Sequence, residues 1–192
     1  EDGTPFADLH RAGRLAVPPG ELADDLYQAT QDITAAAGLP AYEISNHAQA
    51  GEESRHNLLY WRYGEFAGIG PGAHGRLLID GARVGTSTER HPEAWLDRTR
   101  EHRNGMIEMV TLTRHEQADE LLLMGLRISE GVDLDRLARI GGMRPSQAKI
   151  DELVMHGVLA QDASTGRIIA TAGGRFILNE IVLQLASSFE PA

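Results

Sequence analysis

The sequence predicts two parts, an α/β part followed by an α+β part made of helices and a hairpin. Three observations predict this: a helix pattern followed at once by a strand pattern over residues 22–45, a hairpin turn at residues 80–81, and a helix-rich pattern from residue 113 onwards. The 192 residues fit one large domain or two small ones. We expect the division at residues 1–109 and 110–192.

The first part begins with a helix that has one apolar face. Its apolar residues recur at steps of three and four, and Gly38 suits its end. A strand pattern over residues 41–45 follows, in which Glu43 could be a pocket carboxylate or an ordinary ion-pair partner. Helix, short loop and strand form half of a βαβ unit, so we expect the end of an open parallel sheet or of an α/β barrel. The apolar residues of the helix are Leu22, Leu26, Ala29, Ile33 and Ala36.

A hairpin is predicted where Asp80-Gly81 separates the short apolar runs 76–79 and 82–85. An Asp-Gly pair in this setting is a strong signal for a two-residue turn, because both of its residues tolerate positive φ. Residues 86–110 are polar and mixed. We expect a short helix over residues 92–103 and a linker after it.

The second part starts with a capping box formed by Thr113 and Glu116. The helix behind it is expected to continue through Ile128 and to end at Gly131, and Asp133 is expected to cap the next helix.

A third helix is expected to start with Pro145 at its first position and to stop at Gly157. A hairpin around residues 164–166 and a final helix over Phe176–Leu185 complete a winged-helix-like order of elements. The third helix is net negative and the chain carries a net charge of −10. Because phosphate contacts require several Lys or Arg, nucleic-acid binding is not expected, and a structural or partner-docking role is favoured.

Composition excludes several kinds of chemistry. The chain has no cysteine, so disulfides, thiolate catalysis and cysteine-ligated iron–sulfur clusters are excluded within it. Neither a His-Glu-x-x-His zinc motif nor a Gly-x-Ser-x-Gly nucleophile elbow is present. No apolar run approaches the roughly 18 residues of a membrane span.

Four glycines lie close together between residues 68 and 75, and Gly70, Gly72 and Gly75 match the spacing of a dinucleotide-binding loop. That interpretation needs a strand before and a helix after the glycines, whereas Pro71 interrupts the loop and a hairpin follows. The alternative is a tight turn that lets a ligand or a neighbouring strand come close, because glycine has no side chain.

The residues with the most distinctive chemistry are His56, Asn57, Tyr60 and Trp61. They are the set that a flat iron macrocycle would need: a nitrogen ligand, a polar hydrogen-bonding group and two aromatic faces. Taken alone, His56 would more often be a surface or structural histidine. Tyr60 and Trp61 alone would more often be core or interface aromatics.

Three segments together resemble the HemW-type haem chaperones, which are also described as oxygen-independent coproporphyrinogen III oxidase-like radical SAM proteins. The first part of the chain and the start of the second add further matches, so the resemblance covers essentially the whole chain. The central segments are Tyr42–Asn46, Ser54–Trp61 and Gly68–Gly75, and the further matches are Glu1–Pro5, Leu121–Arg127 and Gly131–Leu134.

The resemblance implies the C-terminal fragment of a radical SAM partial (β/α) barrel followed by a small winged-helix-like domain. In the family, earlier strands carry a Cys-x-x-x-Cys-x-x-Cys loop for a [4Fe–4S] cluster and most contacts to S-adenosylmethionine. We therefore expect the chain to be the C-terminal portion of a longer protein. Without the cluster ligands, it should be inactive alone in radical chemistry.

The resemblance also implies site residues. His56 is the candidate axial ligand of haem iron, Asn57 a hydrogen-bonding neighbour, and Tyr60 and Trp61 the stacking walls. Residues 72–74, which are Gly72, Ala73 and His74, are candidates for the vicinity of S-adenosylmethionine, and no catalytic residue is expected.

The implied function is that of a cytoplasmic haem chaperone that passes haem to acceptor haem proteins. The alternative is an oxidase that converts coproporphyrinogen III to protoporphyrinogen IX in porphyrin biosynthesis. A third possibility is a plain interaction module. The sequence leaves the haem acceptor and the oligomeric state open.

Overall fold

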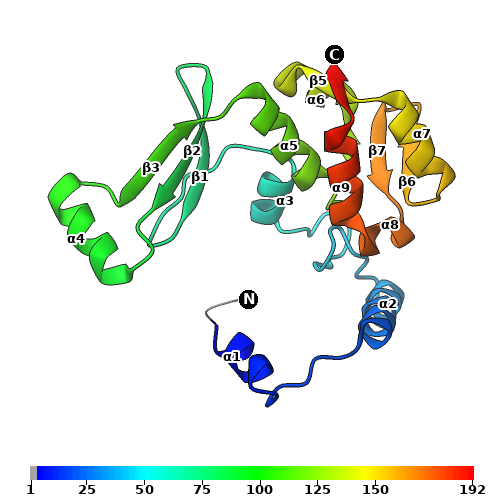
Figure 1. Ribbon diagram of the computed structural model, residues 1–192, viewed down its shortest axis with the longest axis horizontal. Coiled ribbons are helices and arrows are strands. Elements are labelled where there is room, and N and C mark those ends of the chain that lie inside the picture. Colours follow the sequence, from blue (N-terminus) through cyan, green and yellow to red (C-terminus); the bar gives the residue numbers. More distant parts are fainter. Residues whose placement is uncertain (1–3) are drawn as a thin grey trace.

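The structure is a computed structural model that describes residues 4–192, so most of the expected match at Glu1–Pro5 lies outside the described residues. Figure 1 shows a three-stranded sheet with one helix at its far end, joined to a helix-rich body that contains the C-terminus. The N-terminal helices lie below that body. The helices are α1 (Pro5–Arg11), α2 (Gly20–Ala36), α3 (Arg55–Trp61), α4 (Pro92–His102), α5 (Arg114–Gly125), α6 (Leu134–Gly141), α7 (Gln147–Met155), α8 (Ala172–Phe176) and α9 (Leu178–Ser187).

Within residues 4–192, the strands form three antiparallel sheets in the order β1-β2-β3, β4-β7-β6 and β5-β8. The first sheet, with α4 at its far end, extends away from the helix-rich body, and the two other sheets belong to that body. The strands are β1 (His74–Ile79), β2 (Ala82–Thr88), β3 (Met106–Thr111), β4 (Val132–Asp133), β5 (Met143–Pro145), β6 (Leu159–Asp162), β7 (Arg167–Ala170) and β8 (Phe189–Pro191).

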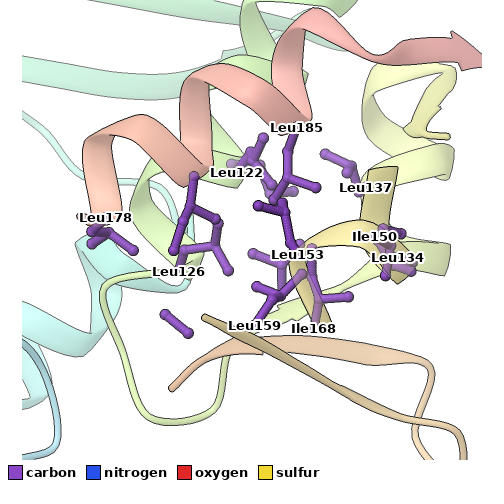
Figure 2. Packing of buried hydrophobic residues seen from close by; sticks show 14 of the residues in the cluster. Leu122, Leu126, Leu134, Leu137, Ile150, Leu153, Leu159, Ile168, Leu178 and Leu185 are labelled. Carbon is purple, nitrogen blue, oxygen red and sulfur yellow. The ribbon is translucent and has the colours of Figure 1, made fainter. Parts of the chain in front are cut away.

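The hydrophobic core lies in the helix-rich body, where α5, α6, α7 and α9 pack over the sheet β4-β7-β6 (Figure 2). Leu122, Leu137, Ile168 and Leu185 are completely buried there. Each such side chain contributes about 1.5–3 kcal/mol through its removal from water. Tyr63, which follows α3, joins the same core, so the first part of the chain is packed onto the second.

The helix expected from the apolar repeat is present as α2, and Gly38 at φ +78° follows its end. Its apolar face is nevertheless exposed, since Ile33 has 70% of its surface accessible. Tyr27 attaches α2 to the rest of the chain: its hydroxyl donates to the Ile44 carbonyl at 3.1 Å, and its ring meets that of Phe176 edge-on at 5.2 Å.

The strand expected over residues 41–45 is not a continuous strand. It forms isolated bridges from Ala41 to His47 and from Glu43 to Ile128. The chain reverses within a few residues of Glu43, so no neighbouring segment runs beside it far enough to form a ladder. The prediction of a strand was therefore wrong, although the extended backbone at Glu43 does pair with the second part of the chain.

The predicted hairpin is confirmed. Strands β1 and β2 pair up to Ile79 opposite Ala82, and the turn residues Asp80 and Gly81 both have positive φ, as this turn requires. The predicted helix near residues 92–103 is confirmed as α4.

The expected linker after α4 is wrong, because it contains β3, which pairs with β2. This strand runs from residue 106 to residue 111 and so crosses position 110. The division of the chain into residues 1–109 and 110–192 stays a prediction.

The capping box at Thr113 and Glu116 is confirmed, and Asp133 caps α6 as expected. The helix α5 ends at Gly125, not at Gly131 as predicted. A side chain at Gly125 would meet Val132 Cγ2 at 2.6 Å, so the chain is already turning back on itself at this point.

Pro145 is not the first residue of a helix. It belongs to β5 and lies opposite Phe189 of β8, while Ser146 caps α7. The predicted hairpin is confirmed as β6 and β7. The predicted final helix is divided into α8 and α9 at Ile177. None of the helices within residues 4–192 is long and apolar enough to cross a membrane.

Candidate functional site

The four residues that the sequence suggests as haem-binding candidates lie on the short helix α3. Ser54 starts this helix by accepting a hydrogen bond from the Asn57 amide at 3.3 Å. Residues four positions apart share a helix face, so His56 pairs with Tyr60 and Asn57 pairs with Trp61. The motif therefore presents two pairs of side chains on two different faces.

The first pair faces solvent. His56 is exposed, and its Nε2 lies 2.9 Å from the Tyr60 hydroxyl, with the two rings nearly perpendicular at 4.6 Å between centroids. Tyr60 in turn packs edge-on against Phe66 at 4.2 Å. These contacts hold an imidazole at the surface beside two aromatic rings.

The second pair, Asn57 and Trp61, faces inward and contacts other segments of the protein. The Asn57 amide donates to the Tyr42 hydroxyl at 3.2 Å, and Arg127 Cζ lies 4.8 Å from the centre of the Trp61 ring. The Trp61 Nε1 is buried and has no hydrogen-bond partner among the described residues. In this arrangement, Asn57 and Trp61 hold α3 against the rest of the protein, while His56 and Tyr60 lie on the outward face of the helix.

Glu43 supports the inward face of this site. It is completely buried, and its Oε1 accepts hydrogen bonds from the Ser45 amide at 2.7 Å, the Ser45 hydroxyl at 2.9 Å and the Asn46 side chain at 2.6 Å. Burial alone would raise the pKa of the Glu43 carboxyl, but these hydrogen bonds and the nearby charge of Arg127 hold that pKa below its ordinary value. Glu43 is therefore a buried anion, and its Oε2 lies 3.9 Å from Arg127 Nη2, which agrees with the interpretation of Glu43 as an ion-pair partner.

The glycine-rich segment forms a tight turn. Gly72 has φ +69°, its amide donates to the Glu89 carbonyl at 2.7 Å, and the Ala73 amide donates to the Thr88 hydroxyl at 2.8 Å. Both amides are thus used inside the protein, while the His74 side chain is exposed at the start of β1. A hairpin follows the glycines, which agrees with the tight-turn interpretation and not with a dinucleotide-binding loop.

Gly75 explains why this turn needs small residues. A Cβ at this position would lie 2.5 Å from the Thr86 hydroxyl and 2.9 Å from the Gly68 amide nitrogen. Segment 66–68 therefore lies against β1 at a distance that only glycine permits.

Metal ligation by protein side chains alone has no support in the part of the chain that the structure describes. No group of three or more His, Cys, Asp or Glu side chains is placed to hold a metal ion there. Because the sequence has no cysteine, it also supplies no cysteine ligand for an iron–sulfur cluster.

Sequence reasoning did not single out Arg127, Tyr42 or Phe66. Arg127 and Tyr42 lie within segments that resemble the family, so that resemblance could have drawn attention to them. Phe66 lies between two such segments, and only the fold brings it to Tyr60.

The fold is shared with a solved radical SAM enzyme. The chain superimposes on coproporphyrinogen III oxidase (HemN) of Escherichia coli with a TM-score of 0.63 over 88% of the chain and 42% of that protein, at 14% sequence identity. No protein-family model matches the chain.

Curated relatives give the closer relationship. The chain is 31% identical to radical S-adenosyl methionine domain-containing protein 1 of Bos taurus, over 100% of the chain and 45% of that protein. It is 34% identical to heme chaperone HemW of Bacillus subtilis (strain 168), over 94% of the chain and 47% of that protein. The chain thus spans about half the length of the curated relatives it matches.

Fold and sequence together show that the chain is similar to radical SAM proteins, to HemN in fold and to radical S-adenosyl methionine domain-containing protein 1 in sequence. Within that class, the chain is a homologue of the proteins named heme chaperone HemW and radical S-adenosyl methionine domain-containing protein 1.

Proposed function

We propose that the protein containing this chain is a haem chaperone that binds haem and delivers it to haem proteins in the cytoplasm. The observation that carries the proposal is the exposed imidazole of His56, which Tyr60 holds in place beside Phe66. Several relatives are named heme chaperones, and they match at 28–34% identity.

The outward face of α3 fits a haem ligand. Bound haem supplies an iron that accepts a nitrogen lone pair, and histidine is a common donor to it. His56 would provide that nitrogen, and Tyr60 would either release Nε2 or leave Nδ1 as the donor. No partner of Nδ1 is seen among the described residues.

The remaining residues of the motif have supporting roles in this proposal. Tyr60 and Phe66 would present apolar ring surface to the macrocycle. Asn57, through Tyr42, and Trp61, through Arg127, would keep α3 in place, although Trp61 also remains a candidate stacking wall.

We further propose that the two parts of the chain have different roles. Residues 1–109 would form the end of a radical SAM partial barrel with its hairpin, and residues 110–192 a winged-helix-like domain that docks partners. Since this chain has no cysteine, the [4Fe–4S] cluster would be held by the part of the protein beyond it. Gly72 and Ala73 would line S-adenosylmethionine through atoms other than their amides, and His74 through its exposed side chain.

The alternative function is oxygen-independent coproporphyrinogen III oxidation, which the shared fold with HemN favours. The experiment uses the complete natural protein with its cluster reconstituted without oxygen. We expect a Soret absorption change on haem addition and no decarboxylation of coproporphyrinogen III. Turnover of coproporphyrinogen III would support the oxidase instead.

The ligand assignment is tested in the same protein with His56→Ala and with His156→Ala, an exposed histidine on the C-terminal cap of α7, as the matched control. We expect His56→Ala to lose the Soret change and His156→Ala to keep it. Unchanged haem binding by His56→Ala would refute the role of His56.

A further inference from the structure

Residues 62–66 connect α3 to the β1-β2-β3 sheet (Figure 1). The segment ends at Phe66, whose ring packs against that of Tyr60 on the outward face of α3, and whose backbone pairs with Arg76 of β1. The path of this segment therefore sets how the ring of Phe66 meets the ring of Tyr60.

The segment contains a backbone conformation that its own sequence does not favour. Tyr63 has φ +54°, in the left-handed region that bulky residues rarely adopt, and it is buried. A conformation of this kind persists only where the surrounding structure enforces it. The contacts around Tyr63 should therefore be the ones that determine the path of the segment.

Two arginines supply these contacts from two different elements. Arg136 of α6 donates through Nη1 to the Arg62 carbonyl at 2.6 Å and through Nη2 to the Tyr63 carbonyl at 3.2 Å. Arg83 of β2 donates through Nη2 to the Gly64 carbonyl at 2.7 Å, and its Cζ lies 4.1 Å from the centre of the Tyr63 ring. The two guanidinium groups thus bond three successive carbonyls at the end of α3, where carbonyls lack partners within the helix.

The two guanidinium groups are close enough to repel each other. Burial and then the charge of Arg83 lower the pKa of Arg136 from its ordinary value. The nearby carboxylate of Asp133 accepts from the backbone amide of Arg136 at 2.8 Å, and no hydrogen bond from either guanidinium to a carboxylate is seen within residues 4–192. The carbonyls of residues 62–64 are therefore the groups that offset this repulsion.

We propose that Arg83 and Arg136 are positioning residues for the haem-facing side of α3, because they hold residues 62–64 in the path that brings Phe66 against Tyr60. This inference rests on the proposed haem-binding function. It makes the aromatic surface of the site depend on contacts from β2 and α6 as well as on α3 itself.

The first measurement uses the complete natural protein without haem. Nuclear magnetic resonance with labelled Phe and Tyr detects the contact between the rings of Phe66 and Tyr60, which a loss of global stability alone would not remove from a folded protein. We expect Arg136→Gln and Arg83→Gln each to weaken this contact. Arg136→Lys should behave like Arg136→Gln, because one ammonium group cannot replace a fork that reaches two successive carbonyls.

The second measurement is the dissociation constant of haem, from an absorption titration. Each Gln variant should raise it by about 2- to 30-fold, the range expected for residues that act on a binding site through their neighbours. Arg139→Gln is the matched control, because Arg139 is an exposed arginine on the same helix as Arg136. It should leave both the ring contact and the dissociation constant unchanged.

An unchanged ring contact in both Gln variants would overturn the proposal, and so would a fully restored contact in Arg136→Lys. A lost contact with unchanged haem affinity would overturn the role in haem binding while the haem chaperone function stands. If the unaltered protein binds no haem, the proposed function fails, and the ring contact still decides whether the two arginines position Phe66. Because the two Gln variants remove contacts from different elements, one remains informative even if the other fails to fold.

Discussion

The hydroxyl of Tyr60 lies 2.9 Å from the Nε2 of His56, one helical turn away on the outward face of α3. The hydroxyl occupies the ring nitrogen that would otherwise be free to bind a metal. It also keeps the imidazole close to the helix, so the same contact both positions His56 and competes with any ligand for it.

Tyr60→Phe separates these two effects. The variant keeps the ring that packs against Phe66 and removes the competing hydroxyl. We expect haem affinity equal to or up to about 10-fold higher than that of the unaltered protein, because a neutral hydrogen bond contributes about 0.5–1.5 kcal/mol. An absorption titration measures this haem affinity. A loss of affinity as large as that of His56→Ala would show that the Tyr60 hydroxyl itself is needed for haem binding.

The buried carboxylate of Glu43 predicts a pH-dependent stability. Its pKa is lowered from the ordinary value of 4.5, so the folded state favours the charged form, and the stabilisation is fully present above that value. It is lost as pH falls through the lower folded-state pKa. We expect Glu43→Gln to reduce the free energy of unfolding by about 1–3 kcal/mol at pH 7.

Denaturant unfolding at several pH values checks this expectation. The difference between the unaltered protein and Glu43→Gln should stay constant from about pH 7 to about pH 5 and shrink below the ordinary pKa of 4.5. A difference that grows as the pH falls would contradict the lowered pKa of Glu43.

Arg76 and Glu120 join the β1-β2-β3 sheet to α5. The guanidinium Nη2 lies 2.6 Å from Glu120 Oε1, both side chains are about three-quarters buried, and Tyr63 donates to the same carboxylate at 3.0 Å. Burial and this neighbouring carboxylate raise the pKa of Tyr63 well above its ordinary value, so the phenol stays a donor.

A double-mutant cycle with Arg76→Gln and Glu120→Gln should give a coupling energy of about 1–2 kcal/mol in unfolding experiments. Arg11 and Asp8 form an exposed pair that serves as the comparison, and its coupling should be near zero. Equal coupling in the two pairs would mean that burial adds nothing to the Arg76–Glu120 interaction.

Gly75→Ala tests the tight packing beside the glycine turn. Since the new Cβ would lie 2.5 Å from the Thr86 hydroxyl, we expect a loss of about 1–3 kcal/mol in the free energy of unfolding. Gly173→Ala is the control, because its nearest neighbour is 4.0 Å away and it lies in α8, where alanine is favoured over glycine. Thermal melting should show destabilisation for Gly75→Ala only.

The parts of the fold that follow from local sequence chemistry were predicted. The Asp80-Gly81 turn, the capping box at Thr113 and the cap at Asp133 depend on residues a few positions apart. The strand β3 was missed because its side chains are mostly exposed, so its sequence lacks the alternation that one buried face produces. The φ angle that the proline ring fixes suits either a first helical turn or a strand, and only the pairing of Pro145 with Phe189 decides between them.

The sequence singled out His56, Asn57, Tyr60 and Trp61 as candidate residues but did not indicate how they are arranged. The order of His56, Asn57, Tyr60 and Trp61 suggests one surface, whereas the helix turns them onto two faces. Their partners Tyr42, Phe66 and Arg127 come from positions up to 66 residues away in the sequence, and only the packing of α3 against the second part of the chain reveals them.

The sparse attachment of α2 has a consequence for the cooperativity of the chain. Its leucines lie at the surface. Tyr27, through Ile44 and Phe176, and Gln31, through His47, attach it to the rest of the described chain. The amide protons of α2 should therefore exchange with solvent through local openings, whereas those near Leu122 and Leu185 should exchange only when the whole domain unfolds. The chain would thus have two levels of protection from exchange, with the contacts of Tyr27 at the boundary between them.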